Sequence, residues 1–144
     1  MKIIHAIVLI AAYVISTGAS SQNSLKTSAS CPLPGEISPQ HLYGTWLARL
    51  DGQAEAASVV FEKHPELAGS VSGRVTRAGV SAQIAGDVDD GAFTLEESLD
   101  GEHISATWLG TVVENTCGQE IRGHWTPARS ERSSPFVLRK RPGW

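Results

Sequence analysis

The chain has 144 residues, with 12 Lys and Arg side chains against 15 Asp and Glu side chains and a formal net charge of −3 at pH 7. This balance argues against a nucleic-acid-binding protein, because such proteins usually carry a clustered basic face. The length predicts one domain, large enough to bury a self-sufficient hydrophobic core.

An export signal is predicted at residues 1–21. Met1-Lys2 is a short basic start, the run from Ile3 to Ile15 is almost wholly apolar, and small residues suited to signal peptidase follow it. This run is shorter than the roughly twenty apolar residues that a membrane-spanning helix needs. Loss of Lys2 with the signal leaves 11 basic against 15 acidic side chains. We therefore expect an exported protein, periplasmic or secreted, with no membrane span.

An extended polar arm is predicted at residues 22–43, because this segment is rich in Ser and Pro and has no regular apolar period. The chain has two cysteines, Cys31 in the arm and Cys117 near the end of the domain. Thiols pair in an oxidising compartment, and no Cys-x-x-Cys spacing suggests a catalytic or metal-binding role. We therefore expect one disulfide, which anchors the arm.

Residues 44–144 are predicted to form an all-β domain. Runs rich in Val, Thr, Ile, Trp and Phe alternate with Gly, Asp-Gly and Pro turn signals, which is typical of antiparallel strands joined by tight turns. Short turns favour an up-and-down order, and closure into an eight-stranded barrel removes exposed strand edges. The predicted strands are Thr45 to Leu50, Ala57 to Lys63, Ser70 to Thr76, Val80 to Val88, Ala92 to Leu99, His103 to Val113, Glu120 to Pro127 and Phe136 to Lys140.

Alternating apolar residues indicate which side of each strand faces the interior. The residues expected inside are Ala57, Val59, Phe61, Val80, Ala82, Ile84, Val88, Phe93, Leu95, Ile104, Ala106 and Trp108. In an up-and-down barrel, the start of the first strand and the turn between strands six and seven lie at the same end. The disulfide would therefore pin the arm across that end and leave the opposite mouth free.

Several short motifs resemble the avidin and streptavidin family. They are Gly44-Thr45-Trp46, Leu67-Ala68-Gly69-Ser70, Ala106-Thr107-Trp108-Leu109-Gly110 and Trp125. Members of that family are eight-stranded up-and-down barrels, so the resemblance implies the same fold.

The resemblance does not extend to the biotin site. Ala48 and Gly52 stand where the family supplies polar contacts to biotin, and no Asp follows Asp100. Because an unpaired buried polar group is costly, biotin binding is not expected.

Four residues are candidates for ligand binding: Trp46, Trp108, Trp125 and Glu97. An indole inside a barrel either fills the core or forms an apolar wall against which a ligand stacks, and both readings stay open for the three tryptophans.

Glu97 has the same strand parity as its apolar neighbours Phe93 and Leu95, so in the assumed register it faces inward. A buried carboxylate needs a partner, and Arg122, Arg74 and Arg139 are candidates. A one-residue slip in register or a bulge would instead turn Glu97 to solvent, and this second outcome is the favoured one.

No catalytic, cofactor-binding or metal-binding constellation is expected. The histidines form no close pair, residues 87–91 lack the spacing of a calcium loop, and no phosphate-binding or dinucleotide-binding glycine motif is present. The preferred hypothesis is a non-enzymatic binding module for a small apolar or aromatic ligand, or a protein loop, at the free mouth. The alternative is a cell-envelope structural or inhibitor-like protein that acts through its outer surface. The oligomeric state and the partner stay open.

Overall fold

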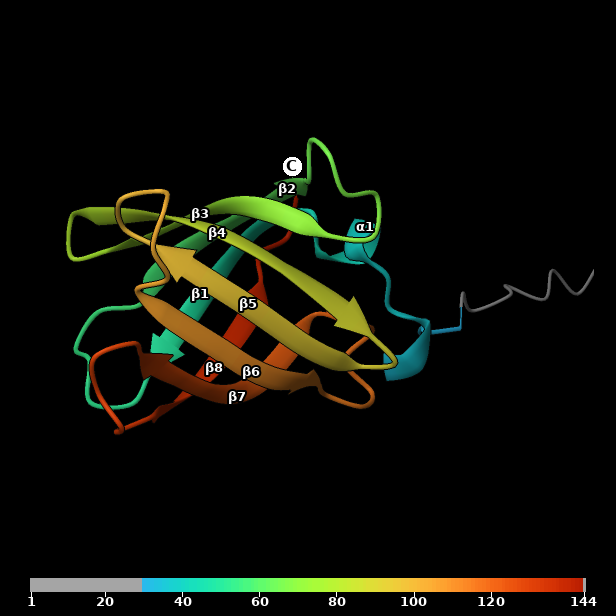
Figure 1. Ribbon diagram of the computed structural model, residues 1–144. Helices are drawn as coiled ribbons and strands as arrows, with labels where there is room; N and C mark the ends of the chain where they lie inside the picture. Colours follow the sequence, from blue (N-terminus) through green and yellow to red (C-terminus); the bar gives the residue numbers. More distant parts are fainter. Residues whose placement is uncertain (1–29, 144) are drawn as a thin grey trace, which may run out of the picture.

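The computed structural model describes residues 30–143, so the predicted export signal and residues 22–29 of the arm lie outside the described residues. Eight strands follow one another in chain order, and each pairs antiparallel with its neighbours (Figure 1). β1 also pairs with β8, which closes the barrel. The strands are β1 (Gly44–Leu50), β2 (Ala57–Lys63), β3 (Val71–Arg77), β4 (Val80–Asp89), β5 (Ala92–Ser98), β6 (Ala106–Val112), β7 (Glu120–Pro127) and β8 (Ser134–Lys140). The predicted fold class is confirmed.

Large side chains fill most of the barrel interior. Trp46, Phe61 and Phe93 form a chain of edge-on contacts with ring centroids 6.0 and 6.1 Å apart. Trp108 and Phe136 make a further such contact, at 5.0 Å. Such edge-to-face pairs add stability beyond the apolar area that they bury. The barrel is therefore a packed core along most of its length rather than a hollow carrier.

The predicted inward face is confirmed except at two positions. Val80 and Ile104 are 59 % and 47 % exposed, whereas the other ten predicted residues are buried. Val80 begins β4 and Ile104 lies in the loop before β6, so both lie at the end where the barrel interior opens to solvent. Strand parity alone does not reveal where along its length a strand leaves the core.

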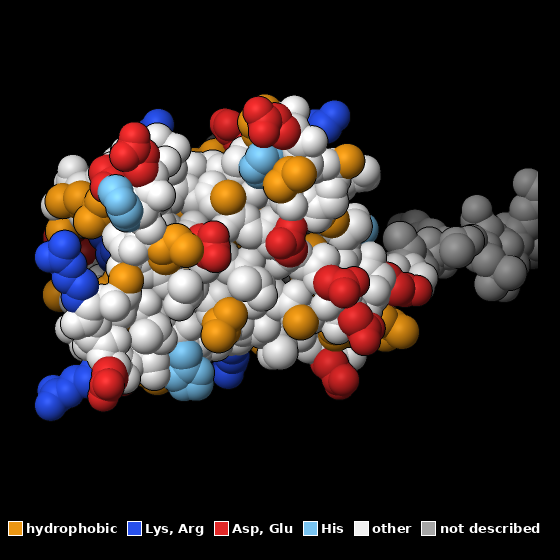
Figure 2. All heavy atoms as spheres, in the orientation of Figure 1, with side chains coloured by type: hydrophobic (Ala, Val, Ile, Leu, Met, Phe, Trp, Pro, Cys, Tyr) orange, Lys and Arg blue, Asp and Glu red, His pale blue; other side chains and the backbone are white. Residues whose placement is uncertain are grey.

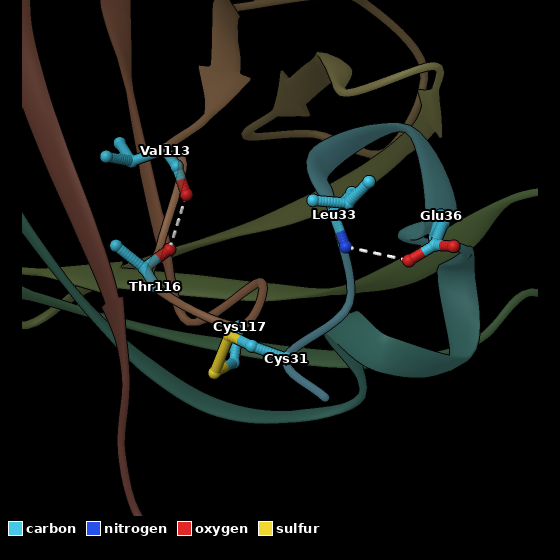
Figure 3. Close-up of a disulfide and its surroundings, with 6 residues drawn as sticks. All are labelled: Cys31, Leu33, Glu36, Val113, Thr116 and Cys117. Atoms are coloured by element: carbon cyan, nitrogen blue, oxygen red, sulfur yellow. Dashed lines mark hydrogen bonds between the residues drawn. A yellow bond between two sulfur atoms is a disulfide. The ribbon is translucent and has the colours of Figure 1, made fainter. Parts of the chain in front are cut away.

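One end of the barrel is closed by the arm, as the predicted disulfide between Cys31 and Cys117 requires (Figure 3). Ile37 packs so tightly against Gly118 that a Cβ on this glycine would clash with Ile37 Cδ1. Leu42 is fully buried, and Lys140 Nζ donates a hydrogen bond to the His41 carbonyl at 2.6 Å. In Figure 1 this closed end is at the right, beside α1.

The described part of the arm is not extended throughout, contrary to the prediction. It contains a 3-10 helix, η1 (Pro34–Glu36), and a short α-helix, α1 (Pro39–Leu42). Proline occupies the first position of each, where a missing N–H costs nothing. The arm is also held by more than its cysteine, since Ile37 and Leu42 both join the hydrophobic core. Because these two apolar residues form no periodic pattern in the sequence, their burial in the core becomes visible only in the folded structure.

The start of β6 differs most from the predicted strand bounds, because the strand begins at Ala106 and not at His103. The Asp100 carboxylate accepts hydrogen bonds from the backbone N–H groups of Glu102 and His103, at 2.9 and 2.8 Å. Its second oxygen lies 2.8 Å from His103 Nδ1. Because these N–H groups bond to the Asp100 side chain, the backbone of Glu102 and His103 forms a turn and does not pair with a neighbouring strand.

Acidification is expected to loosen this turn. Hydrogen bonds from the backbone of His103 and Glu102 hold the pKa of the Asp100 carboxyl well below its usual range. A carboxyl whose pKa is lower in the folded than in the unfolded chain stabilises the fold. This stabilisation is fully present above the pKa of an aspartate in the unfolded chain, about 3.9, and it is lost as the pH falls through the lower pKa of the folded state.

Amide hydrogen exchange, followed by NMR, checks whether the carboxylate holds the turn, since Asp100→Ala removes the negative charge as protonation would. At neutral pH, Asp100→Ala should speed exchange at Glu102 and His103. Asp51→Ala is the matched control at the same barrel end, because Asp51 is an exposed aspartate in the turn after β1. Unchanged protection of both amides in Asp100→Ala would show that the carboxylate does not hold the turn.

Candidate functional site

Three of the four predicted site residues meet at the open end of the barrel, on neighbouring strands. Glu97 lies near the end of β5, and Trp108 of β6 pairs directly with Trp125 of β7. Both indole Nε1–H groups donate to Glu97 Oε2, at 3.1 Å from Trp108 and 3.2 Å from Trp125. Glu97 is 2 % exposed. Glu97 therefore faces inward, as its strand parity indicates, and the favoured prediction that a slip or a bulge turns it to solvent is wrong.

The charged partner of Glu97 is Arg77, which was not among the predicted candidates. The guanidinium donates from its two terminal nitrogens to the two carboxylate oxygens, at 2.6 and 3.2 Å. It also lies over the Trp125 ring, with Cζ 4.9 Å from the centroid. A two-pronged charged pair of this kind is both strong and specific in geometry.

The predicted partners of Glu97 lie elsewhere. Arg122 and Arg139 both bond to Glu120, and Arg74 is exposed. Strand parity could have identified Arg77, because it lies two residues after buried Val75 and therefore points to the same side of β3. Assigning residue 77 to a turn hid this signal.

Trp46 belongs to the other end of the barrel. Its side chain is fully buried, and its Nε1–H donates to the Leu42 carbonyl at 2.7 Å. It therefore joins the arm to the core and is not brought together with Glu97, Trp108 and Trp125.

A pocket of about 230 Å³ lies at the open mouth, beside the Arg77–Glu97 pair. Its wall is mainly aliphatic, and Val80 and Leu99 are both more than half exposed. Its lining residues are Gln53, Val75, Arg77, Ala78, Val80, Ala82, Glu97 and Leu99. Trp108 and Trp125 are not among them, so their indoles bind the Glu97 carboxylate but do not form the pocket wall. In Figure 1 the mouth is at the left, where β5 ends.

A larger hollow of about 680 Å³ lies outside the barrel, across β2 to β5. Its charged lining includes Glu62, Arg74 and Glu96, which are exposed and form no ion pair within the described residues. Figure 2 shows acidic side chains over this side of the molecule. The mouth is the stronger candidate site, because there a buried charged pair with fixed geometry adjoins an apolar wall.

Other kinds of site find no support among residues 30–143. No three His, Cys, Asp or Glu side chains of this part come close enough to hold a metal ion. Nor is any helix within that range long and apolar enough to cross a membrane. Comparison of the chain with protein-family models and with curated proteins finds no match.

Proposed function

We propose that the protein is a non-enzymatic binding module that takes a small, largely apolar ligand, or an apolar protein loop, in the open mouth of the barrel. The observation that carries this proposal is the Arg77–Glu97 pair beside an aliphatic pocket. Binding sites commonly combine an apolar wall with a few well-placed polar groups. The opposite end is occupied by the arm and its disulfide, which leaves the mouth as the accessible end.

The chemistry of the pocket favours binding over catalysis. Acid and base catalysis needs titratable groups that are free to exchange protons with a substrate. Glu97 and Arg77 are the titratable residues among those lining the pocket, and each is engaged with the other. Both oxygens of Glu97 already accept hydrogen bonds, so the carboxylate serves to hold Arg77 in place.

Export and an avidin-like origin are further parts of this proposal. The disulfide supports folding in an oxidising compartment, such as the periplasm or the extracellular space. The closed up-and-down barrel supports kinship with the avidin-like folds, in agreement with the short motifs around Trp46 and Trp108.

The outer hollow favours a second candidate function. A protein that acts through its outer surface, as a cell-envelope or inhibitor-like protein would, has there a concave area with the exposed charges of Glu62, Arg74 and Glu96. This function would not depend on the mouth residues, so variants of the mouth separate the two.

Titration of the purified, oxidised protein with small aromatic and aliphatic molecules tests the proposal, with tryptophan fluorescence and calorimetry as readouts. We expect a saturable response that Leu99→Asp abolishes. Leu109→Asp is the matched control, because Leu99 and Leu109 are similarly exposed, at 60 % and 58 %, and Leu109 lies on the outer face of β6. No response across the panel, or an equal response of Leu99→Asp and the wild type, would favour the outer-surface function.

A further inference from the structure

We infer that the ligand of the mouth carries a carboxylate, which binds the side of the Arg77 guanidinium that faces away from Glu97. This inference rests on the proposed function and names the class of ligand. Arginine has five N–H donors. Within the described residues, the hydrogen bonds of the Arg77 side chain all go to Glu97 and use two of its donors. Three donors are left for a ligand.

The free donors of Arg77 belong to its exposed part. Glu97 is 2 % exposed and Arg77 is 20 % exposed, so the carboxylate forms the inner half of the pair and the guanidinium the outer half. Arg77 lines the mouth pocket. A group that enters from solvent therefore meets the guanidinium before it meets the carboxylate.

This orientation favours a negative ligand group although the pair is neutral overall. The energy between charges falls with distance, so an anion beside Arg77 is attracted more by the nearer guanidinium than it is repelled by Glu97 behind it. No other acidic side chain lines the pocket, and Gln53 adds an amide donor. A planar guanidinium also matches the two oxygens of a carboxylate, with two parallel hydrogen bonds.

The pocket wall limits the rest of the ligand. Val75, Val80, Ala82 and Leu99 present aliphatic surface. The volume of about 230 Å³ is below that of pockets for drug-sized molecules, which begin near 300 Å³. The site therefore suits a small monocarboxylate with an apolar body, such as an arylalkanoic or short fatty acid.

Glu97, Trp108 and Trp125 act as positioning residues for Arg77. The carboxylate holds the guanidinium in one orientation, the two indoles hold the carboxylate, and the Trp125 ring lies beneath the cation. Because Arg77 is ordered before the ligand arrives, less side-chain entropy is lost on binding.

A matched series of three ligands tests the inference by isothermal titration calorimetry at low salt: phenylacetate, phenylacetamide and phenethylamine. They share one aromatic body and differ in the polar group. Phenylacetate is expected to bind about tenfold more tightly than the amide, as charge-assisted hydrogen bonds are roughly twice as strong as neutral ones. Phenethylamine is expected to bind most weakly, and added salt should weaken phenylacetate alone.

The double variant Arg77→Gln/Glu97→Gln should remove the preference for carboxylate over amide. Both residues are changed because Arg77→Gln alone would leave a buried carboxylate without its cation. Arg74→Gln is the control, since it removes an arginine from the same strand but from the outer face, and it should keep the tenfold preference.

The outcomes separate this inference from the proposed function. Equal binding of all three compounds would overturn the carboxylate assignment and leave the mouth as an apolar binding site. Tightest binding of phenethylamine would also overturn it, because a cation would then have displaced Arg77 from Glu97. Binding of none of the three, together with no response in the broader panel, would overturn both.

Discussion

Replacing Arg77 with Met is expected to lower the free energy of unfolding by about 3 to 5 kcal/mol, the range for loss of one partner from a buried ion pair. Glu97 is 2 % exposed and would lose the cation that compensates its buried carboxylate. The two indole N–H groups would still donate to it, but they carry no full charge. Equilibrium unfolding in urea, followed by tryptophan fluorescence, measures the change.

Two further variants show whether this loss belongs to the ion pair. Arg74→Met removes an exposed arginine from the same strand, so it should change stability by no more than about 0.5 kcal/mol. Arg77→Met/Glu97→Gln should recover a large part of the loss, because the buried charge is gone and the amide oxygen still accepts from the indoles. If Arg77→Met unfolds at the same urea concentration as Arg74→Met, the pair does not stabilise the mouth.

Replacing both cysteines with serine is expected to lower the free energy of unfolding by about 2 to 5 kcal/mol. Cys31 and Cys117 are 86 residues apart, so the disulfide closes a long loop and restricts the unfolded chain strongly in the chain-entropy account. Urea unfolding of the oxidised wild type and of Cys31→Ser/Cys117→Ser measures the difference.

Reductant provides the control for the disulfide, since it should destabilise the wild type and leave the double serine variant unchanged. The disulfide lies at the closed end and the pocket at the open end, so a folded double serine variant should bind the mouth ligand with unchanged affinity. A stability loss below about 0.5 kcal/mol would mean that Ile37 and Leu42 alone hold the arm.

The two ends of the barrel are thus completed in different ways. At the closed end, Trp46 donates a hydrogen bond to the Leu42 carbonyl, and Ile37 and Leu42 of the arm join the hydrophobic core. At the open end, the core finishes in a charged layer, where Arg77 covers Glu97 and the Trp125 ring. The arm stays on the closed end because the disulfide joins it to the barrel, whereas at the open end Arg77 keeps hydrogen-bond donors for a ligand.

The sequence by itself determined the all-β class, the order of the eight strands and the disulfide. These follow from local rules. Strand parity assigns each side chain to a face, Asp-Gly turns join neighbouring strands, and two cysteines allow one intramolecular pairing. The position of Cys117 in the turn after β6 also placed the arm at the correct end.

The tertiary structure decided which residues meet inside the barrel. Arg77 and Glu97 lie on β3 and β5, which are separated by β4, so no hairpin register relates them. Their contact depends on how closure of the sheet brings strand ends together at the mouth. The same closure made Trp108 and Trp125 hydrogen-bond donors to Glu97 and gave Ile37 and Leu42 a core to join. Parity along a strand is a local property, but a partner across the interior exists only once the barrel has closed.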